Sequence, residues 1–311
     1  MYILRRIIFA ALVLVCVSAL TFTLGRLTPG DPVETLLAQV QNPTPEDIRM
    51  ARQSLGLDRP IVMQYISWLS RVLSGDLGVS YRTNMPISHE IMVRLPATLM
   101  LMAGSLATML TVGGGFGLTA ALYRDKAPDY LVRVFNIVAI SVPAFCVGIF
   151  LTLLFSVRLG WLPIVGVLSP LRLVLPSLTI GLSTGAGFAR LVRAQMIATM
   201  SQDFVQAALA FGVKRRRVIL NNVIKNSLPP IITSIGLFIG AMLGGSAIIE
   251  TLFSWPGIGV YAVEAIFGRD YPVIQAYALL MAAIYICVNL MTDIINHILV
   301  PTVAAEAGRY G

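Results

Sequence analysis

The sequence predicts an all-α integral membrane protein whose helices cross a bilayer six times. Of its 311 residues, 57% are hydrophobic and only 12% are charged, whereas roughly a quarter of the residues of an ordinary soluble domain are charged. The charges are clustered and leave six long apolar stretches, each near or above the roughly 17–25 residues that a helix needs to cross a bilayer. From these stretches we expect spans at residues 7–25, 97–123, 134–157, 173–192, 228–250 and 273–298.

The first apolar stretch has two interpretations. It follows Arg5 and Arg6, and a basic start before an apolar core is also the pattern of a cleavable secretory signal. Its apolar run is longer than the usual signal core, and five further apolar stretches follow it. A first membrane span is therefore the preferred interpretation.

The net charge of +8 is unevenly distributed along the chain. If the N-terminus is cytoplasmic, the segments expected in the cytoplasm are strongly basic, as in the run Lys214-Arg215-Arg216-Arg217. The long segment 26–94, expected outside, has seven basic and seven acidic residues and is neutral. Because cytoplasmic segments of membrane proteins are enriched in Lys and Arg, this asymmetry predicts that both termini are cytoplasmic. The basic charge thus indicates orientation and not a nucleic-acid partner.

Residues 26–94 are expected to form a small extracytoplasmic cap. The segment opens with turn-forming residues from Thr28 to Pro32 and then has helical character up to Gly56. After Pro60, apolar residues recur at the spacing of one helical face. Because so short a segment cannot build a core of its own, we expect it to pack on the membrane helices.

The segment 201–226, between the fourth and fifth predicted spans, is expected to form a cytoplasmic elbow of two helices. Ser201 is the expected N-cap of the first helix, and Gly212 is placed to end it in a left-handed conformation. The second helix is strongly basic and is expected to stop before Pro229 and Pro230. One apolar face of the first helix has a small-residue centre and consists of Phe204, Ala207, Ala208 and Phe211.

Two interpretations of this elbow remain open from the pattern. It could lie in the lipid headgroups, with its Lys and Arg side chains on anionic lipid. It could instead dock into a groove on a soluble partner. The Ala-centred face favours the groove, because a lipid-facing surface would gain more from large apolar side chains.

The elbow carries residues that resemble a known motif. Gln206-Ala207-Ala208, with Gly212 six residues after Gln206 and Leu228-Pro229 further on, is similar to the EAA motif of bacterial ABC import permeases. In that family the elbow is the coupling helix that docks into the ATP-binding subunit. Gln206 stands where the motif has Glu, so a role that rests on that carboxylate is not carried over.

Further runs extend the resemblance over nearly the whole chain, to the dipeptide, oligopeptide and nickel permease family. The order and number of these runs make the resemblance specific, although each alone would be weak. They are RLTPGDP from Arg26, LGLDRP from Leu55, GDLGVS from Gly75, WPGIG from Trp255 and RDYP from Arg269.

The resemblance implies a type I ABC importer permease fold in a bacterial cytoplasmic (inner) membrane. It also implies a second homologous permease subunit, one or two ATPase subunits and an extracytoplasmic solute-binding protein. The chain has no Gly-Lys dipeptide and hence no phosphate-binding P-loop. ATP and Mg are therefore expected on the ATPase subunits. This chain is expected to bind no cofactor and to be a transport subunit rather than an enzyme.

Three glycines in the fifth span recur at four-residue spacing, which lets helix backbones approach closely. They are Gly236, Gly240 and Gly244. We expect them to serve packing within the bundle, with a lining of the solute pathway or an interface between permeases as the alternative.

Three polar residues in the last two spans are candidates for the solute pathway. Asn289 and Asp293 lie one turn apart in span six, where we favour a polar clamp between helices over a solute ligand. Glu250 ends span five and could steady an outer loop or face the pathway. No His or Cys residue has a partner at metal-ligand spacing, so no metal site is predicted.

The sequence leaves alternatives open for the substrate and for the energy source of transport. The runs resemble permeases for short peptides and permeases for nickel or metal chelates about equally. An ion-gradient-driven secondary transporter is the alternative to an ATP-driven importer, but the two halves of the chain show no clear repeat. An intramembrane enzyme would need a nucleophile with its base, or a metal-binding set, within the spans, and the sequence shows neither.

Overall fold

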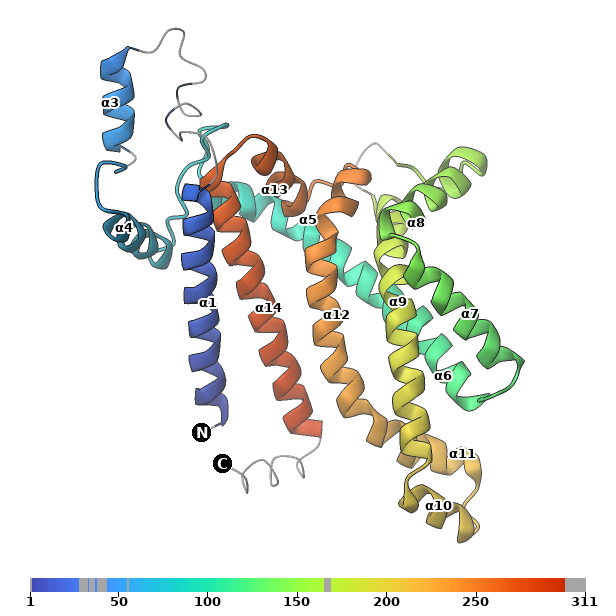
Figure 1. Cartoon of the computed structure of the whole chain (residues 1–311). Coiled ribbons are helices and arrows are strands. Elements are labelled where there is room, and N and C mark those ends of the chain that lie inside the picture. Colours follow the sequence, from blue (N-terminus) through green and yellow to red (C-terminus); the bar gives the residue numbers. More distant parts are fainter. Residues whose placement is uncertain are drawn as a thin grey trace. The chain divides into compact units, whose positions relative to one another are not determined.

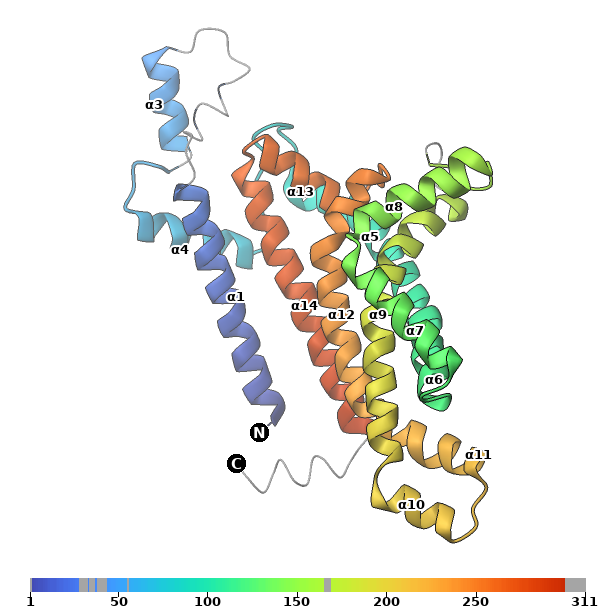
Figure 2. The ribbon, with the colours of Figure 1, turned by 45° about the vertical axis from the view of Figure 1, so that its right-hand side comes forward.

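The computed structural model describes residues 2–27, 33, 37, 44–54, 56–164 and 169–299 of the chain. Within these ranges the regular structure is helical, and the β-structure is a single bridge between Val79 and Pro86. The chain divides into two compact units (Figures 1 and 2). Unit 1 comprises Met1–Thr98 and Pro256–Ile286, and unit 2 comprises Leu99–Trp255 and Cys287–Gly311.

Unit 1 is built around the start of α5 (Ile87–Thr108), the short helix α13 (Ile258–Phe267) and the start of α14 (Tyr271–Leu299). Side chains from these three helices form a buried cluster that holds them together. Its members are Ile87, Ile91, Tyr261, Ala265, Val273 and Ala276.

The remaining helices of unit 1 are α1 (Tyr2–Leu27), α3 (Pro45–Ser54) and α4 (Ile61–Leu73). The aromatic ring of Phe22 on α1 lies 5.4 Å from the ring of Tyr65 and 5.6 Å from that of Trp68, both on α4. Aromatic pairs at such separations add to the stabilisation from buried area. The segment after Pro60 therefore forms the amphipathic helix that the sequence predicts, and this helix packs on α1.

Helix α3 begins with a reciprocal side-chain cap. The Thr44 hydroxyl donates to the Asp47 carboxylate at 2.6 Å, and the Asp47 backbone N–H donates to the Thr44 hydroxyl at 3.2 Å. This arrangement satisfies backbone donors that a helix start leaves free. The bond from the Thr44 hydroxyl, together with one from the Thr44 backbone N–H at 2.9 Å, lowers the pKa of the Asp47 carboxyl.

Unit 2 is organised around α9 (Pro170–Met200), which packs against the helices on either side of it in the sequence. These are η1 (Met109–Gly113), α6 (Gly114–Leu122), α7 (Ala127–Ser141), α8 (Ala144–Leu151) and α12 (Ile224–Leu252). Two shorter helices, α10 (Asp203–Ala210) and α11 (Arg215–Val218), project from the end of α9 that is remote from α8 (Figure 1). Unit 2 also contains two further π-helical segments, η2 (Thr152–Arg158) and η3 (Ile219–Val223), together with the end of α5 and the later part of α14.

Glycines let α9 approach the η1–α6 segment at backbone distance. A Cβ atom at Gly113 would lie 2.6 Å from the backbone oxygen of Gly185, and one at Gly117 would lie 2.6 Å from that of Ala189. Small residues at such crossings allow van der Waals contact between helices that no hydrophobic force drives together in lipid. Within the run Gly113-Gly114-Gly115, it is thus Gly113 that lets α9 pack closely.

A buried ion pair joins α7 to α9. One edge of the Arg193 guanidinium group binds both carboxylate oxygens of Asp129, with Nε at 2.6 Å from Oδ1 and a terminal nitrogen at 2.7 Å from Oδ2. The Asp129 side chain is 0% exposed, and Arg133 approaches it to 3.3 Å. A buried carboxylate needs such pairing, because an unpaired charge away from water is strongly unfavourable.

The predicted count of six spans is not confirmed. Among the described residues, four helices are long and apolar enough to cross a membrane, and a bent pair raises the number to five. In α1, the apolar stretch Ile8–Thr23 is shorter than these. The bent pair is α7 with α8–η2, which meet at 102° beside Pro143. The segment expected as a single span at residues 134–157 is therefore sharply broken at this proline.

Two helix boundaries differ from the prediction. Helix α5 begins at Ile87, before the predicted span 97–123, and its first turns accommodate charged residues because Arg94 pairs with Glu90 at 2.7 Å and packs over the Tyr261 ring. The basic helix after the elbow does not stop before Pro229 and Pro230 but continues through η3 and α12. Both prolines lie in the first two turns of α12, and membrane helices tolerate proline because side chains and neighbouring helices can satisfy the freed backbone carbonyls.

We expect Gly113→Ala to lower the thermal stability of the protein, because the added methyl group would force two helix backbones apart. The matched variant Gly115→Ala places the same group in open space, where replacing glycine favours a helix by about 0.5–1 kcal/mol. Thermal unfolding in detergent, followed by circular dichroism, should show midpoints shifted in opposite directions. A Gly113→Ala protein as stable as the wild type would contradict the close-packing interpretation.

Candidate functional site

The elbow of unit 2, residues 201–226, begins directly after α9 ends at Met200. Gln202, in an extended conformation, is the N-cap of α10 and makes no side-chain capping bond. Ser201 instead continues the helical backbone of α9, and its hydroxyl donates to the Ile197 carbonyl at 2.7 Å. The prediction that Ser201 caps α10 is therefore wrong, because its hydroxyl is used by the turn that precedes it.

Gly212 ends α10 in the left-handed conformation that the sequence predicts, with φ of 81°. The Val213 N–H donates to the Ala208 carbonyl at 3.1 Å, and the Gly212 N–H donates to the Leu209 carbonyl at 3.0 Å. This pair of bonds is a Schellman motif, which satisfies carbonyls at a helix end and reverses the chain direction. The turn between α10 and α11 is therefore sharply defined by backbone bonds.

The apolar face predicted for α10 points away from unit 2. Phe211 is 87% exposed, while Phe204 and Ala207 are exposed and Ala208 is half-buried. Val205, on another side of the helix, is only 3% exposed and anchors α10 to the unit. The helix thus presents two aromatic rings around an alanine centre.

Gln206 connects the elbow to α9. Its side-chain amide nitrogen lies 3.0 Å from the Met200 carbonyl oxygen, in position to donate a hydrogen bond to the last turn of α9. A glutamate carboxylate at this position could only accept hydrogen bonds. Gln206 therefore supplies a contact that the Glu of the EAA motif could not make.

Basic residues lie beside the exposed face of α10. Lys214, Arg216 and Arg217, together with Leu220 and Asn221, border a surface depression of about 240 Å³ at the start of α11. The three cationic side chains are exposed. The elbow thus combines an apolar protrusion with a positively charged flank.

The other sequence-predicted residues lie on α12 and α14, away from the elbow. A Cβ atom at Gly236 would lie 2.9 Å from the Thr292 hydroxyl oxygen and 3.2 Å from Asn289 Oδ1, so these helices meet closely at Gly236. The Asn296 amide donates to the Thr233 hydroxyl at 2.8 Å at the same seam. A polar clamp between the helices, as expected for Asn289, is consistent with these contacts.

The remaining candidates differ in their packing and burial. Gly244 has open space where a Cβ would stand, and Gly240 is half-buried, so close packing is observed at the first of the three glycines and not at Gly244. Asp293 is half-buried on α14. Glu250 is fully buried at the far end of α12, about 21 Å along the helix from Gly236.

Sequence reasoning missed the residues that hold the elbow in place. Val205 recurs with Ala208 and Leu209 at i+3 and i+4, a second apolar spacing that competes with the predicted face, so only its burial against the rest of unit 2 identifies it as the anchor. The Ser227 and Thr199 hydroxyl oxygens lie 2.9 Å apart and join α12 to α9 next to the elbow. Because these two residues are 28 positions apart in the sequence, no local pattern predicts their contact.

Comparison with known families defines the class of protein as a multi-pass membrane component of a transport system. The sequence profile described as "Binding-protein-dependent transport system inner membrane component" matches residues 113–305, and its N-terminal companion matches residues 1–102. The chain belongs to this family, the permease subunits of ABC importers, and within it to the dipeptide and oligopeptide group.

Individual relatives cover almost the whole chain. The glutathione transport system permease protein GsiC of Pectobacterium atrosepticum is 37% identical over 302 residues, which is 97% of this chain and 98% of the relative. The GsiC proteins of Shigella flexneri and Salmonella typhimurium match with the same identity and coverage. The family and these relatives leave the secondary-transporter alternative without support.

A solved structure shares the fold. An inward-facing structure of the MetNI methionine ABC transporter contains a chain that aligns with a TM-score of 0.56 and 15% sequence identity, covering 68% of this chain and 96% of that one. At this identity the similarity concerns the fold alone. The two chains therefore share the arrangement of their helices over the aligned part.

We expect Gly212→Val to loosen the elbow, because a side chain in the left-handed region costs roughly 1–2 kcal/mol. Gly212→Asn should have a smaller effect, since Asn tolerates this conformation. Hydrogen–deuterium exchange of peptides covering residues 203–213 should therefore be fastest in the valine variant and intermediate in the asparagine variant. Equal exchange in all three proteins would show that the Schellman turn does not hold α10.

Proposed function

We propose that α10 is the surface on which an ATPase subunit docks, and that the chain thereby forms part of an ATP-driven importer. The observation that carries this proposal is the orientation of α10, with Val205 turned inward and the Phe204–Ala207–Phe211 face turned outward. A small-residue centre between aromatic edges suits a groove on a protein. The same face would gain little from insertion into lipid, because stabilisation by burial grows with apolar area and alanine side chains bury little of it.

The elbow is connected so that a force on α10 would reach two long helices together. Gln206 bonds to the end of α9, and the chain after Gly212 runs through α11 and η3 into α12 without a break. The contact of Thr199 with Ser227 ties α9 to α12 just beyond the elbow. Movement of the ATPase subunits would therefore displace these helices as one body and favour a different packing of the bundle.

The distribution of charge supports a cytoplasmic position for the elbow. Lys214, Arg216 and Arg217 flank α10, and Arg124 and Lys126 occupy the loop between α6 and α7. By the preference of basic segments for the cytoplasm, both termini also lie on that side of a bacterial inner membrane. ATP and Mg would bind to the ATPase subunits, since this chain has no P-loop.

The complete importer would contain further subunits. A second, homologous permease would complete the solute pathway, and an extracytoplasmic solute-binding protein would deliver the solute to it. The family description, which names dependence on a binding protein, supports this assembly.

We infer that the solute is a short peptide. Relatives with 37% identity over nearly the whole chain are glutathione permeases by name, and glutathione is a tripeptide. This similarity favours the peptide alternative over nickel or a metal chelate, between which the sequence motifs alone do not decide.

The docking surface is tested by Ala207→Trp, which places a large ring at the centre of the exposed face. Overfilling a fitted contact costs about 1–3 kcal/mol, so ATP-driven uptake of glutathione by the reconstituted importer should fall about tenfold or more. Leu209→Trp is the control, because Leu209 is also exposed but lies on the far side of α10 from this face, and it should change uptake by less than about twofold. Normal uptake by the Ala207→Trp importer would refute docking through α10.

A further inference from the structure

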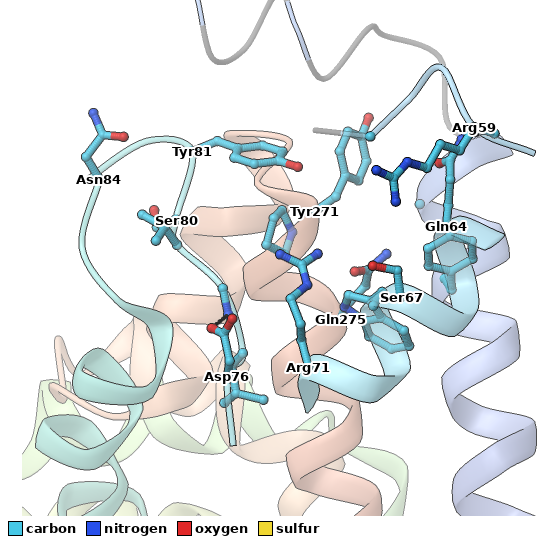
Figure 3. A pocket seen from close by; sticks show the side chains of 18 residues that line it. Arg59, Gln64, Ser67, Arg71, Asp76, Ser80, Tyr81, Asn84, Tyr271 and Gln275 are labelled. Carbon is cyan, nitrogen blue, oxygen red and sulfur yellow. Dashed lines mark hydrogen bonds between the residues drawn. The ribbon is translucent and has the colours of Figure 1, made fainter. Parts of the chain in front are cut away.

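Unit 1 contains a pocket of about 390 Å³ that is separate from the elbow and from the α12–α14 seam. Its walls come from the end of α1, the residues before and along α4, the loop that follows α4, and the first turns of α14 (Figure 3). Pockets of roughly 300–1,000 Å³ are typical of small-molecule sites. This pocket is therefore large enough for a solute the size of a di- or tripeptide.

Two guanidinium groups supply positive charge to the pocket. Arg59 precedes α4 and Arg71 lies in its last turn, and Figure 3 shows both side chains reaching into the pocket. Among the described residues, neither arginine forms an ion pair. A planar guanidinium group without a carboxylate partner is well suited to bind a ligand carboxylate.

A buried hydroxyl group adds a donor without a partner. Tyr271, at the start of α14, is only 8% exposed, and its hydroxyl makes no hydrogen bond within the described structure. Buried polar groups are normally hydrogen-bonded, because leaving one unpaired costs free energy. The Tyr271 hydroxyl is thus a group that a bound ligand would satisfy.

The pocket also offers acceptors. The Gln64 side-chain nitrogen donates to the Arg59 carbonyl at 2.7 Å, which orients the amide, while its oxygen is buried and has no described partner. Asp76 uses one carboxylate oxygen to accept the Gly78 N–H at 2.9 Å. The other oxygen of Asp76 is available to a donor such as an ammonium or amide N–H.

The wall opposite α4 is held in place by a buried carboxylate. The Ser80 hydroxyl donates to Asp270 at 2.6 Å, and the backbone N–H of Tyr81 donates to the same carboxylate at 3.2 Å. Asp270 is itself buried at the turn between α13 and α14. The loop is therefore fixed before any ligand arrives, which reduces the entropy lost on binding.

We propose that this pocket binds the transported peptide by its terminal carboxylate, with Arg59, Arg71 and the Tyr271 hydroxyl as donors and Gln64 and Asp76 accepting its N–H groups. The proposal rests on the proposed function, because it takes the solute to be a peptide. It assigns to the permease itself a site that contacts the solute. The site would contribute to selectivity for solutes with a free carboxylate.

The test uses the assembled importer in nanodiscs without its binding protein, and two probes, trialanine and trialanine amide, which differ in the carboxylate. Binding is measured by saturation-transfer NMR and titration. Trialanine should bind about tenfold more tightly than the amide, the effect of losing charge-assisted hydrogen bonds. Equal binding of the two probes to the wild-type importer would overturn the proposal.

Variants then locate the site. Arg71→Ala should remove the preference for trialanine, whereas Arg49→Ala, which alters an exposed arginine of α3 paired with Glu46, should retain it. Tyr271→Phe removes only the unpartnered hydroxyl and should weaken trialanine binding about three- to tenfold without loss of thermal stability. A preference that persists in both pocket variants would show that the carboxylate binds elsewhere.

A different result would refute the proposed function itself. Peptide uptake that is absent from the complete wild-type importer, with binding protein and ATP, would refute peptide import whatever the binding results. Normal uptake with unchanged binding in Arg71→Ala and Tyr271→Phe would refute the pocket alone.

Discussion

Close backbone contact along α9 is the constraint on which unit 2 depends. Water cannot satisfy polar backbone groups in a bilayer, so the chain forms long helices, and helices in lipid associate through packing rather than hydrophobic exclusion. Gly113 and Gly117 bring η1 and α6 to the backbone of α9, and the Asp129–Arg193 pair ties α7 to the same helix. Because its neighbours are fitted at this distance, α9 has little freedom to move independently of them.

The elbow is attached to this rigidly held helix. It consists of eight residues of α10, closed by a Schellman turn and anchored by one buried valine. A helix this short has little stability of its own, so its position is set by bonds to α9 and by the chain that continues into α12. The proposed coupling follows from this arrangement, since an exposed protrusion can transmit displacement only if its base is rigid.

Unit 1 is stabilised differently. The Phe22–Tyr65–Trp68 contacts hold α4 on α1, and the buried Asp270 organises the loop that follows α4. Fixing this loop leaves a polar pocket with two exposed arginines and a buried tyrosine hydroxyl that has no described partner. An unpaired buried hydroxyl is unfavourable in the absence of a ligand, and this cost, next to two guanidinium groups without a described ion pair, is the physical reason to assign a ligand to the pocket.

The sequence by itself determined the membrane class, the position of the elbow, the left-handed turn at Gly212 and the family, because charge depletion, glycine conformation and ordered motifs are local signals. Only the tertiary structure decided which face of α10 is buried, how α7 bends away from α8, and that Arg94 belongs to a helix. It also decided that Asp129 meets Arg193 and that Ser80 meets Asp270. These outcomes depend on partners 64 and 190 residues apart, and no periodicity within one segment encodes which distant side chain will satisfy a buried charge.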